Sequence, residues 1–259
     1  MITNNKTGNL LKIDDASIYF EISGCEGAQP LVLLHGGMGC SFDFNTLLPT
    51  LAEKHKIISI DSRGHGRSTL GNEGLSYQRL EQDVIEVLRH LGIEQTAIIG
   101  FSDGGTVGYR LMASSIIKVT KLATIGAPFE LKSDDQRREI FSRITGESWR
   151  EKFPSNYESY QSLNPSPDFD RLVKSTVSMW LDSNGYPRDA VNNLEGDVLV
   201  LRGDNDYFFN RVEAVELANR IKKSSFMNIA FAGHAAHEDQ ANIVLLSLKA
   251  FFENKTENN

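Results

Sequence analysis

Short apolar runs recur along the chain, and most are separated by stretches whose apolar residues are spaced three or four apart. The apolar runs predict strands near residues 10–14, 18–23, 31–35, 57–61, 96–101, 120–126, 197–202 and 226–231. The spaced stretches predict helices near residues 44–54, 76–92, 103–115, 210–223 and 239–253. Short β-branched strands that alternate with helices are typical of an α/β fold, in which a mostly parallel sheet is covered on both faces.

One long segment, residues 129–192, interrupts this alternation because it contains no strong strand pattern. It combines charged helical stretches near residues 133–145 and 170–183 with Asn-Pro and Ser-Pro breaks. We therefore expect a helical cap inserted into one large domain. The predicted division is a core of residues 1–128 and 193–259 and a cap of residues 129–192.

The sequence Gly-Phe-Ser-Asp-Gly-Gly, residues 100–105, joins a predicted strand directly to a predicted helix. A turn this tight brings backbone against backbone, so its glycines leave out the Cβ atoms that would clash. Ser102 is then held at the apex, facing the N-terminus of the helix. This arrangement favours a nucleophilic serine, because free N–H groups and the helix dipole stabilise a developing oxyanion.

A second glycine-rich loop, beginning His35-Gly36-Gly37-Met38, follows the strand near residues 31–35. It is the expected place for the second oxyanion donor, a backbone N–H. Gly37 is the first candidate and Met38 the alternative, while the backbone N–H of Asp103 is the expected first donor. We expect His35 to brace this loop.

An acid and a histidine follow later strands in the order Ser, Asp, His, which is the chain order expected of a hydrolase with such a serine turn. Asp206 lies 104 residues after Ser102, and His234 lies 28 residues after Asp206. Asp204 and Glu130 remain alternative acids, and His237 remains an alternative base. His234 is preferred because the glycine before it permits a tight exit from the strand.

These ordered motifs resemble the serine hydrolases of the α/β-hydrolase fold over nearly the whole sequence. The resemblance implies an eight-stranded, mostly parallel sheet with helices on both faces and a helical cap. It implies that Ser102 is the nucleophile, Asp206 the orienting acid and His234 the general base. The small-residue turn at residues 100–105 is similar to that of valacyclovir-hydrolase-like small esterases.

The cap is expected to select the substrate. Met38, Phe129, Trp149 and Trp180 are candidate residues of an apolar substrate pocket. Asp103 supports two interpretations, since an acid stabilises a helix N-terminus and a carboxylate beside the nucleophile could also pair with a substrate amine.

Composition narrows the function classes. The chain has 27 Lys and Arg against 34 Asp and Glu, a formal charge of −7, so no basic stripe is available for nucleic acid. The two cysteines, Cys25 and Cys40, have no metal-binding or disulfide spacing, and we expect neither a metal nor a cofactor. No run has the length of a signal peptide or of a membrane span, which predicts a cytoplasmic protein. The expected oligomeric state is a monomer or a homodimer. Residues 254–259 form a polar tail that we expect to fray.

The expected activity is cleavage of a small carboxylic ester, or a related acyl bond, through an acyl-enzyme. Three alternatives stay open because the same fold hosts them: a lyase, a cofactor-free oxygenase, and a small-molecule receptor with little turnover.

Overall fold

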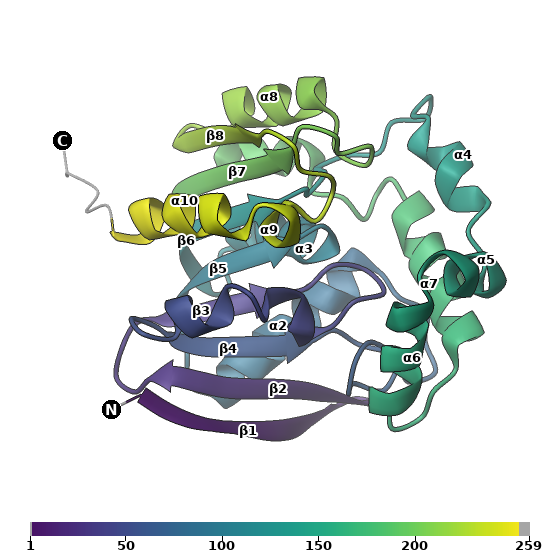
Figure 1. Ribbon diagram of the computed structural model, residues 1–259, viewed down its shortest axis with the longest axis horizontal. Helices are drawn as coiled ribbons and strands as arrows, with labels where there is room; N and C mark the ends of the chain where they lie inside the picture. Colours follow the sequence, from purple (N-terminus) through teal and green to yellow (C-terminus); the bar gives the residue numbers. More distant parts are fainter. Residues whose placement is uncertain (1, 254–259) are drawn as a thin grey trace.

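In the computed structural model, which describes residues 2–253, eight strands form one sheet in the order β1-β2-β4-β3-β5-β6-β7-β8 (Figure 1). The strands are β1 (Ile2–Ile13), β2 (Ala16–Cys25), β3 (Pro30–Leu34), β4 (Lys56–Asp61), β5 (Gln95–Phe101), β6 (Lys118–Ile125), β7 (Asp197–Gly203) and β8 (Ser224–Ile229). β2 pairs antiparallel with β1 and with β4, and the remaining pairs are parallel. The predicted mostly parallel, eight-stranded sheet is confirmed. The polar tail predicted to fray lies outside the described residues.

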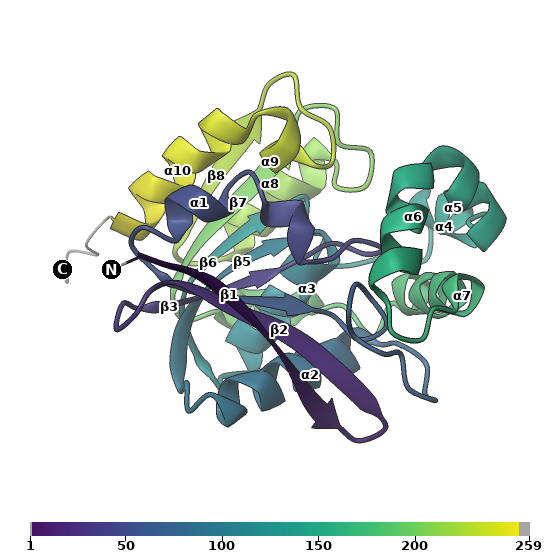
Figure 2. The ribbon, with the colours of Figure 1, turned by 60° about the horizontal axis from the view of Figure 1, so that its bottom comes forward.

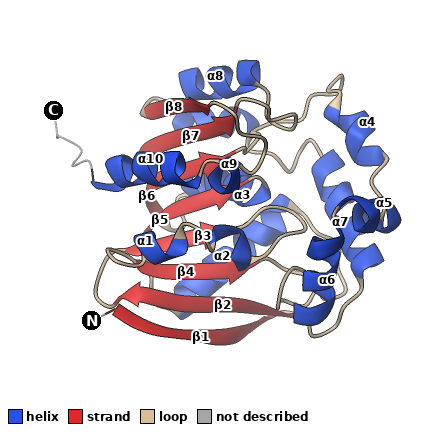
Figure 3. Ribbon diagram, in the orientation of Figure 1, coloured by secondary structure: helices blue, strands red, loops and turns tan. Residues whose placement is uncertain are grey.

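Helices cover both faces of the sheet, as the alternating pattern predicts (Figures 2 and 3). One face carries α2 (Tyr77–His90), α3 (Asp103–Ser114) and α8 (Arg211–Arg220), and the other carries α1 (Leu48–Leu51), α9 (Ala236–Asp239) and α10 (Ala241–Glu253). α2 shows the cause, because Leu80, Val84 and Leu88 recur four residues apart and are all buried against the sheet.

Four α-helices lie between β6 and β7 in the chain, beyond the carboxyl ends of the parallel strands (Figure 1), and a 3-10 helix, Arg188–Asn193, follows them. The four α-helices are α4 (Arg137–Ser142), α5 (Gly146–Lys152), α6 (Pro154–Leu163) and α7 (Phe169–Leu181). We call these four helices the cap. Ligands of α/β folds bind at the carboxyl ends of the strands, so the cap is placed over the expected site. The domain boundaries at residues 128 and 193 stay a prediction.

Two helix predictions are wrong in extent. Residues 44–54 do not form one helix, since a 3-10 turn at Ser41–Phe44 is followed by the single turn of α1. Pro49 has no N–H and fits only the first turn of a helix, so α1 begins immediately before it. The stretch 133–145 contains only α4, because the Asp135 side chain accepts a hydrogen bond from the Arg137 N–H and forms a turn first.

Within the described residues, no helix is long and apolar enough to cross a membrane. The apolar core lies in two layers, one on each side of the sheet, and the larger layer extends into the cap. The cap is therefore packed onto the same core that supports the loops at the carboxyl ends of the strands.

Candidate active site

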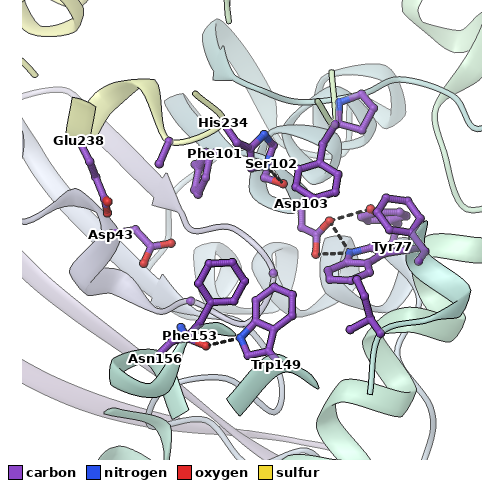
Figure 4. Close-up of a pocket in the computed structure, with 18 of the residues that line it drawn as sticks. Asp43, Tyr77, Phe101, Ser102, Asp103, Trp149, Phe153, Asn156, His234 and Glu238 are labelled. Atoms are coloured by element: carbon purple, nitrogen blue, oxygen red, sulfur yellow. Dashed lines mark hydrogen bonds between the residues drawn. The ribbon is translucent and has the colours of Figure 1, made fainter. Parts of the chain in front are cut away.

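Ser102 stands at a sharp turn between β5 and α3, in a backbone conformation that L-residues rarely adopt. Its φ is +49° and its ψ is −115°. The turn is possible because a Cβ atom on Gly104 would lie 2.0 Å from the Leu34 carbonyl oxygen, and one on Gly100 would lie 2.5 Å from the Gly104 oxygen. The Ser102 N–H donates to the Ile125 carbonyl at 2.8 Å, which ties the turn to β6. The hydroxyl faces the His234 ring at the wall of a cavity (Figure 4).

His234 and Asp206 complete a hydrogen-bonded chain that begins at Ser102. His234 Nε2 lies 2.9 Å from Ser102 Oγ, and His234 Nδ1 lies 2.9 and 3.0 Å from the two carboxylate oxygens of Asp206. Because Nδ1 faces a carboxylate, it carries the ring hydrogen and leaves Nε2 free to accept a proton from the serine.

The surroundings of Asp206 fix its carboxylate. Its side chain is fully buried, and Oδ1 accepts hydrogen bonds from the N–H groups of Phe208 and Phe209 at 2.8 and 3.1 Å. Arg202 donates to the Asp206 carbonyl oxygen at 3.1 Å. The rings of Phe101 and Phe208 each lie 5.1 Å from the His234 ring, so the imidazole is held between two aromatic side chains.

The alternative acids are engaged elsewhere. Asp204 pairs with Arg211 and accepts a hydrogen bond from Asn228 at 3.0 Å, and the Asn228 contact lowers its pKa most. Glu130 pairs with Lys132 at 2.8 Å. The geometry therefore favours Asp206.

The alternative base, His237, has no exposed surface. It packs against Phe101 and Phe44, with ring centroids 4.5 and 5.6 Å apart. Burial lowers its pKa to about 4. Since His234 is the histidine that contacts the serine, His237 is a core residue of this structure.

The two expected oxyanion donors lie beside the serine. Gly37, Asp103 and Ser102 all border the same cavity. Within residues 2–253, the N–H groups of Gly37 and Asp103 donate to no protein acceptor. His35 braces the Gly37 loop as expected, since Nδ1 donates to the Gly36 carbonyl at 2.7 Å and Nε2 accepts from the Ser62 N–H at 2.8 Å.

The side chain of Asp103 is buried next to these donors. It accepts hydrogen bonds from the Tyr77 hydroxyl and from the Trp180 indole N–H (Figure 4). Burial raises its pKa, while the hydrogen bonds from Trp180 and Tyr77 act in the opposite direction. Two protein donors therefore already occupy this carboxylate, and the hypothesis that it pairs with a substrate amine stays a prediction.

A cavity of about 340 Å³ opens above Ser102 between the sheet and the cap. Trp149 and Trp180, two of the candidate pocket residues, line it. Its wall includes six further aromatic side chains. These are Tyr77, Phe101, Phe141, Phe153, Tyr186 and Phe208. Three polar side chains, Asp43, Asn156 and Glu238, also border the cavity.

Met38 and Phe129 do not line this cavity, which corrects two pocket expectations. The Met38 side chain is buried, and its carbonyl oxygen accepts a hydrogen bond from Asn156 at 2.6 Å. Phe129 has no exposed surface. The Arg220 guanidinium carbon lies over the Phe129 ring, 5.2 Å from the ring centroid. Both side chains are apolar, and apolar side chains serve core and pocket equally.

Tyr77, Phe208 and Asn156 border the cavity but are not among the residues predicted from the sequence to do so. Phe208 had a usable signal, because it lies two residues after Asp206 on the same loop. Tyr77 and Asn156 had none, since they come from α2 and α6, which only the packed structure brings to Ser102. Among the described residues, no group of three or more His, Cys, Asp or Glu side chains could hold a metal ion.

Comparison with known proteins agrees with the geometry. Residues 29–160, about half of the chain, match the alpha/beta hydrolase fold family. Esterase YbfF of Escherichia coli (strain K12) is 25% identical over 242 residues, which are 86% of this chain and 92% of that protein. The uncharacterized hydrolase YugF of Bacillus subtilis (strain 168) is 33% identical over 96 residues, 37% of this chain and 35% of that protein. The solved esterase EaEST from Exiguobacterium antarcticum superposes with a TM-score of 0.80 at 20% identity, covering 96% of this chain and 100% of that chain.

The chain therefore belongs to the alpha/beta hydrolase fold family. It is a hydrolase of this family and is similar to the esterase YbfF. The narrower resemblance to valacyclovir-hydrolase-like esterases stays a prediction.

Proposed function

We propose that the protein is a serine esterase that cleaves a small carboxylic ester through an acyl-enzyme. The observation that carries the proposal is the continuous hydrogen-bonded chain from Ser102 through His234 to Asp206. A serine hydroxyl is a weak nucleophile at neutral pH and needs an adjacent base. A binding protein or receptor has no need of such an aligned proton path.

The mechanism follows from the positions of these atoms. His234 Nε2 takes the Ser102 proton as Oγ attacks the ester carbonyl carbon, and Asp206 stabilises the resulting imidazolium. The N–H groups of Asp103 and Gly37 hold the oxyanion of the tetrahedral intermediate, each worth about 3 kcal/mol of transition-state stabilisation. His234 then returns its proton to the leaving alcohol, which leaves the acyl group on Ser102. In the second half of the reaction His234 takes a proton from a water molecule as the water attacks the acyl carbon, and it returns that proton to Ser102 Oγ as the acid is released.

The volume and the aromatic walls of the cavity are consistent with a small substrate that has an apolar part. Its volume of about 340 Å³ lies at the low end of the range for small-molecule sites, and its walls are mostly aromatic. The name of the E. coli relative, esterase YbfF, also supports an ester. A short or medium acyl chain, or an aromatic acyl group, is the substrate class that these walls favour.

The test is hydrolysis of p-nitrophenyl esters of two to eight carbons by the wild type and by Ser102→Ala, His234→Ala and Asp206→Asn. Wild-type turnover should fall about 10⁴-fold or more in each variant, because members of such a triad act as a unit. A fluorophosphonate should label Ser102 in the wild type, as detected by mass spectrometry.

Asp204→Asn is the matched control, because it removes a neighbouring acid that bonds Asn228 and Arg211 instead of His234. We expect it to keep turnover within about fivefold of the wild type, as is usual for substitutions away from a site. Ester turnover that survives Ser102→Ala would contradict the proposal, because no acyl-enzyme could then form on Ser102. Wild-type turnover no higher than that of the variants would also contradict it and would favour lyase chemistry. Ligand binding without any turnover would favour a receptor.

A further inference from the structure

The carboxylate of Asp103 joins the turn that carries Ser102 to the cap. Asp103 is the first residue of α3, Tyr77 is the first residue of α2, and Trp180 lies in the last turn of α7. The Tyr77 hydroxyl donates to Oδ1 at 2.7 Å, and the Trp180 Nε1–H is shared between Oδ1 and Oδ2 at 2.9 and 2.8 Å. Trp180 is the one cap residue of this group, and Figure 4 shows the donors converging on the carboxylate.

The same carboxylate and indole also support the loop that holds Gly37. A Cβ atom added to Gly37 would lie 2.5 Å from Asp103 Oδ2 and 2.7 Å from Trp180 Cζ2. Only glycine therefore lets the loop lie this close. Since the N–H groups of Gly37 and Asp103 are the proposed oxyanion donors, the contact holds both donor segments against one indole.

The position of the indole is itself fixed from the core. The Tyr186 hydroxyl donates to the Trp180 carbonyl oxygen at 2.9 Å, and the Tyr186 ring lies edge to face with Tyr77, with centroids 5.0 Å apart. Arg110 on α3 donates to the Gly185 carbonyl at 3.0 Å, which holds the chain that leaves α7. Trp180 is also buried, with 8% of its surface exposed.

We propose that Trp180 is a positioning residue for catalysis, which acts through Asp103 and Gly37 to hold the two oxyanion donors at the spacing that the intermediate requires. The proposal rests on the proposed function. Oxyanion donors act only when they are preorganised at hydrogen-bond distance, and a misplacement of about 1 Å costs roughly a hundredfold in rate. The cap then contributes to the chemical step as well as to substrate selection.

The competing interpretation is that Trp180 is only a wall of the substrate cavity. A wall contacts the substrate and the tetrahedral intermediate equally, so its loss weakens both by the same factor. A positioning residue for the oxyanion hole affects the intermediate selectively. A trifluoromethyl ketone, which forms a tetrahedral oxyanion on Ser102, and the matching secondary alcohol, which forms none, distinguish these two cases.

The experiment compares the wild type with Trp180→Phe, which keeps an aromatic ring and removes the indole N–H. We expect kcat to fall at least about tenfold and the ketone to lose affinity by the same factor as kcat/KM, with the affinity of the alcohol within twofold of the wild type. Tyr77→Phe, which removes the other donor to Asp103, should also lower the affinity for the ketone, by a smaller factor. It is the second variant if Trp180→Phe fails to fold.

Tyr109→Phe is the matched control. Tyr109 is also a buried residue, on α3, and its hydroxyl lies 2.6 Å from Thr124 Oγ1, away from the cavity. It should lower stability without changing the ratio of ketone to alcohol affinity.

Three results decide the matter. In the first result the wild type hydrolyses esters, and Trp180→Phe lowers the affinities for ketone and alcohol equally or lowers neither. The positioning role is then overturned and the proposed function stands. A ratio that falls equally in Tyr109→Phe also overturns the role, because a general loss of packing then explains it. If the wild type neither hydrolyses esters nor binds the ketone, the proposed function fails, and the positioning role fails with it.

Discussion

Ser102 occupies a backbone conformation that costs about 1–3 kcal/mol relative to ordinary φ and ψ values. Several hydrogen bonds hold it there. Its N–H donates to Ile125 at 2.8 Å, and its carbonyl accepts from Gly105 and Thr106 at 2.9 and 3.0 Å. These bonds use the neighbouring strand β6 and the helix α3 that follows the turn, so the strain is compensated by regular structure. The result is a hydroxyl directed at His234.

At the same scale, burial of His237 makes stability depend on pH. Its pKa is lowered to about 4, mainly because burial disfavours the charged ring. In the unfolded chain the ring titrates near pH 6.5, so the unfolded state binds the proton first as the pH falls. The stability that His237 contributes is therefore complete above about pH 6.5 and is lost as the pH falls towards 4. Between pH 6.5 and 5 this loss is about 2 kcal/mol.

Urea unfolding at pH 7.5 and pH 5 measures this effect. We expect His237→Leu to lose about 2 kcal/mol less than the wild type between the two values. His90→Leu, at an exposed histidine of α2, is the control and should behave like the wild type. Equal pH dependence in His237→Leu and the wild type would show that the buried ring does not control acid stability.

Among the elements, the loop between β7 and α8 connects the cap to Asp206, the proposed orienting acid. Arg137, the first residue of α4, donates to the Phe208 carbonyl at 2.8 Å, while the Phe208 N–H donates to Asp206 Oδ1 at 2.8 Å. Arg137 also forms a buried ion pair with Glu213 at 3.2 Å. The start of α4 therefore holds the loop that orients Asp206.

We expect Arg137→Lys to lower kcat/KM several-fold and to destabilise the fold by about 1–3 kcal/mol. A lysine cannot reproduce the several directed bonds of a guanidinium, and the Phe208 carbonyl and Glu213 would lose their donor. Ester kinetics and urea unfolding measure the two effects.

Arg138→Lys is the control, because the neighbouring arginine donates to carbonyls at Lys132 and Leu181 and does not contact the Asp206 loop. It should keep kcat/KM within about twofold of the wild type, as expected of a substitution away from the site. Equal losses of activity in both variants would mean that α4 acts through the cap as a whole.

At the level of the whole molecule, the sheet and the cap differ in how deeply they are buried. The central strands β3, β5 and β6 contain fully buried residues such as Leu31, Ile98 and Leu122, whereas α5 and α6 each bury a single residue, Gly146 and Tyr160. Buried, hydrogen-bonded strands open only with global unfolding, while weakly packed helices open locally. We therefore expect the sheet to be more stable against local opening than the cap helices α5 and α6.

Hydrogen exchange followed by mass spectrometry tests this difference. Peptides from β5 and β6 should exchange slowest and those from α5 and α6 fastest. A phosphonate attached to Ser102 should slow exchange in the last turn of α7, because the adduct fills the cavity that Trp180 lines. Ser102→Ala treated with the same reagent is the control. Uniform exchange across strands and cap helices would contradict the picture.

Much of the fold could be predicted from the sequence because its signals are local. The central parallel strands are buried on both faces and therefore read as short apolar runs, and residues 100–105 must be glycine-rich for the turn to close. The cap was harder to predict. Its helices are short and polar, so α5 and α6 have no strong periodic pattern, and the extent of α4 depends on a turn formed by the Asp135 side chain.

The sequence by itself determined the eight strands, the serine turn and the order of the candidate residues Ser102, Asp206 and His234, because neighbouring residues encode strands and turns. Only the tertiary structure shows the order of the strands, the contact of His234 with Asp206 instead of Asp204, and the residues of the cavity wall. Phe129 and Trp180 are both large apolar residues in or beside the cap, yet one lies in the core and the other contacts Asp103. The physical reason is that the neighbours of a side chain depend on how segments far apart in the sequence pack together. A local sequence pattern does not say which of those segments come into contact.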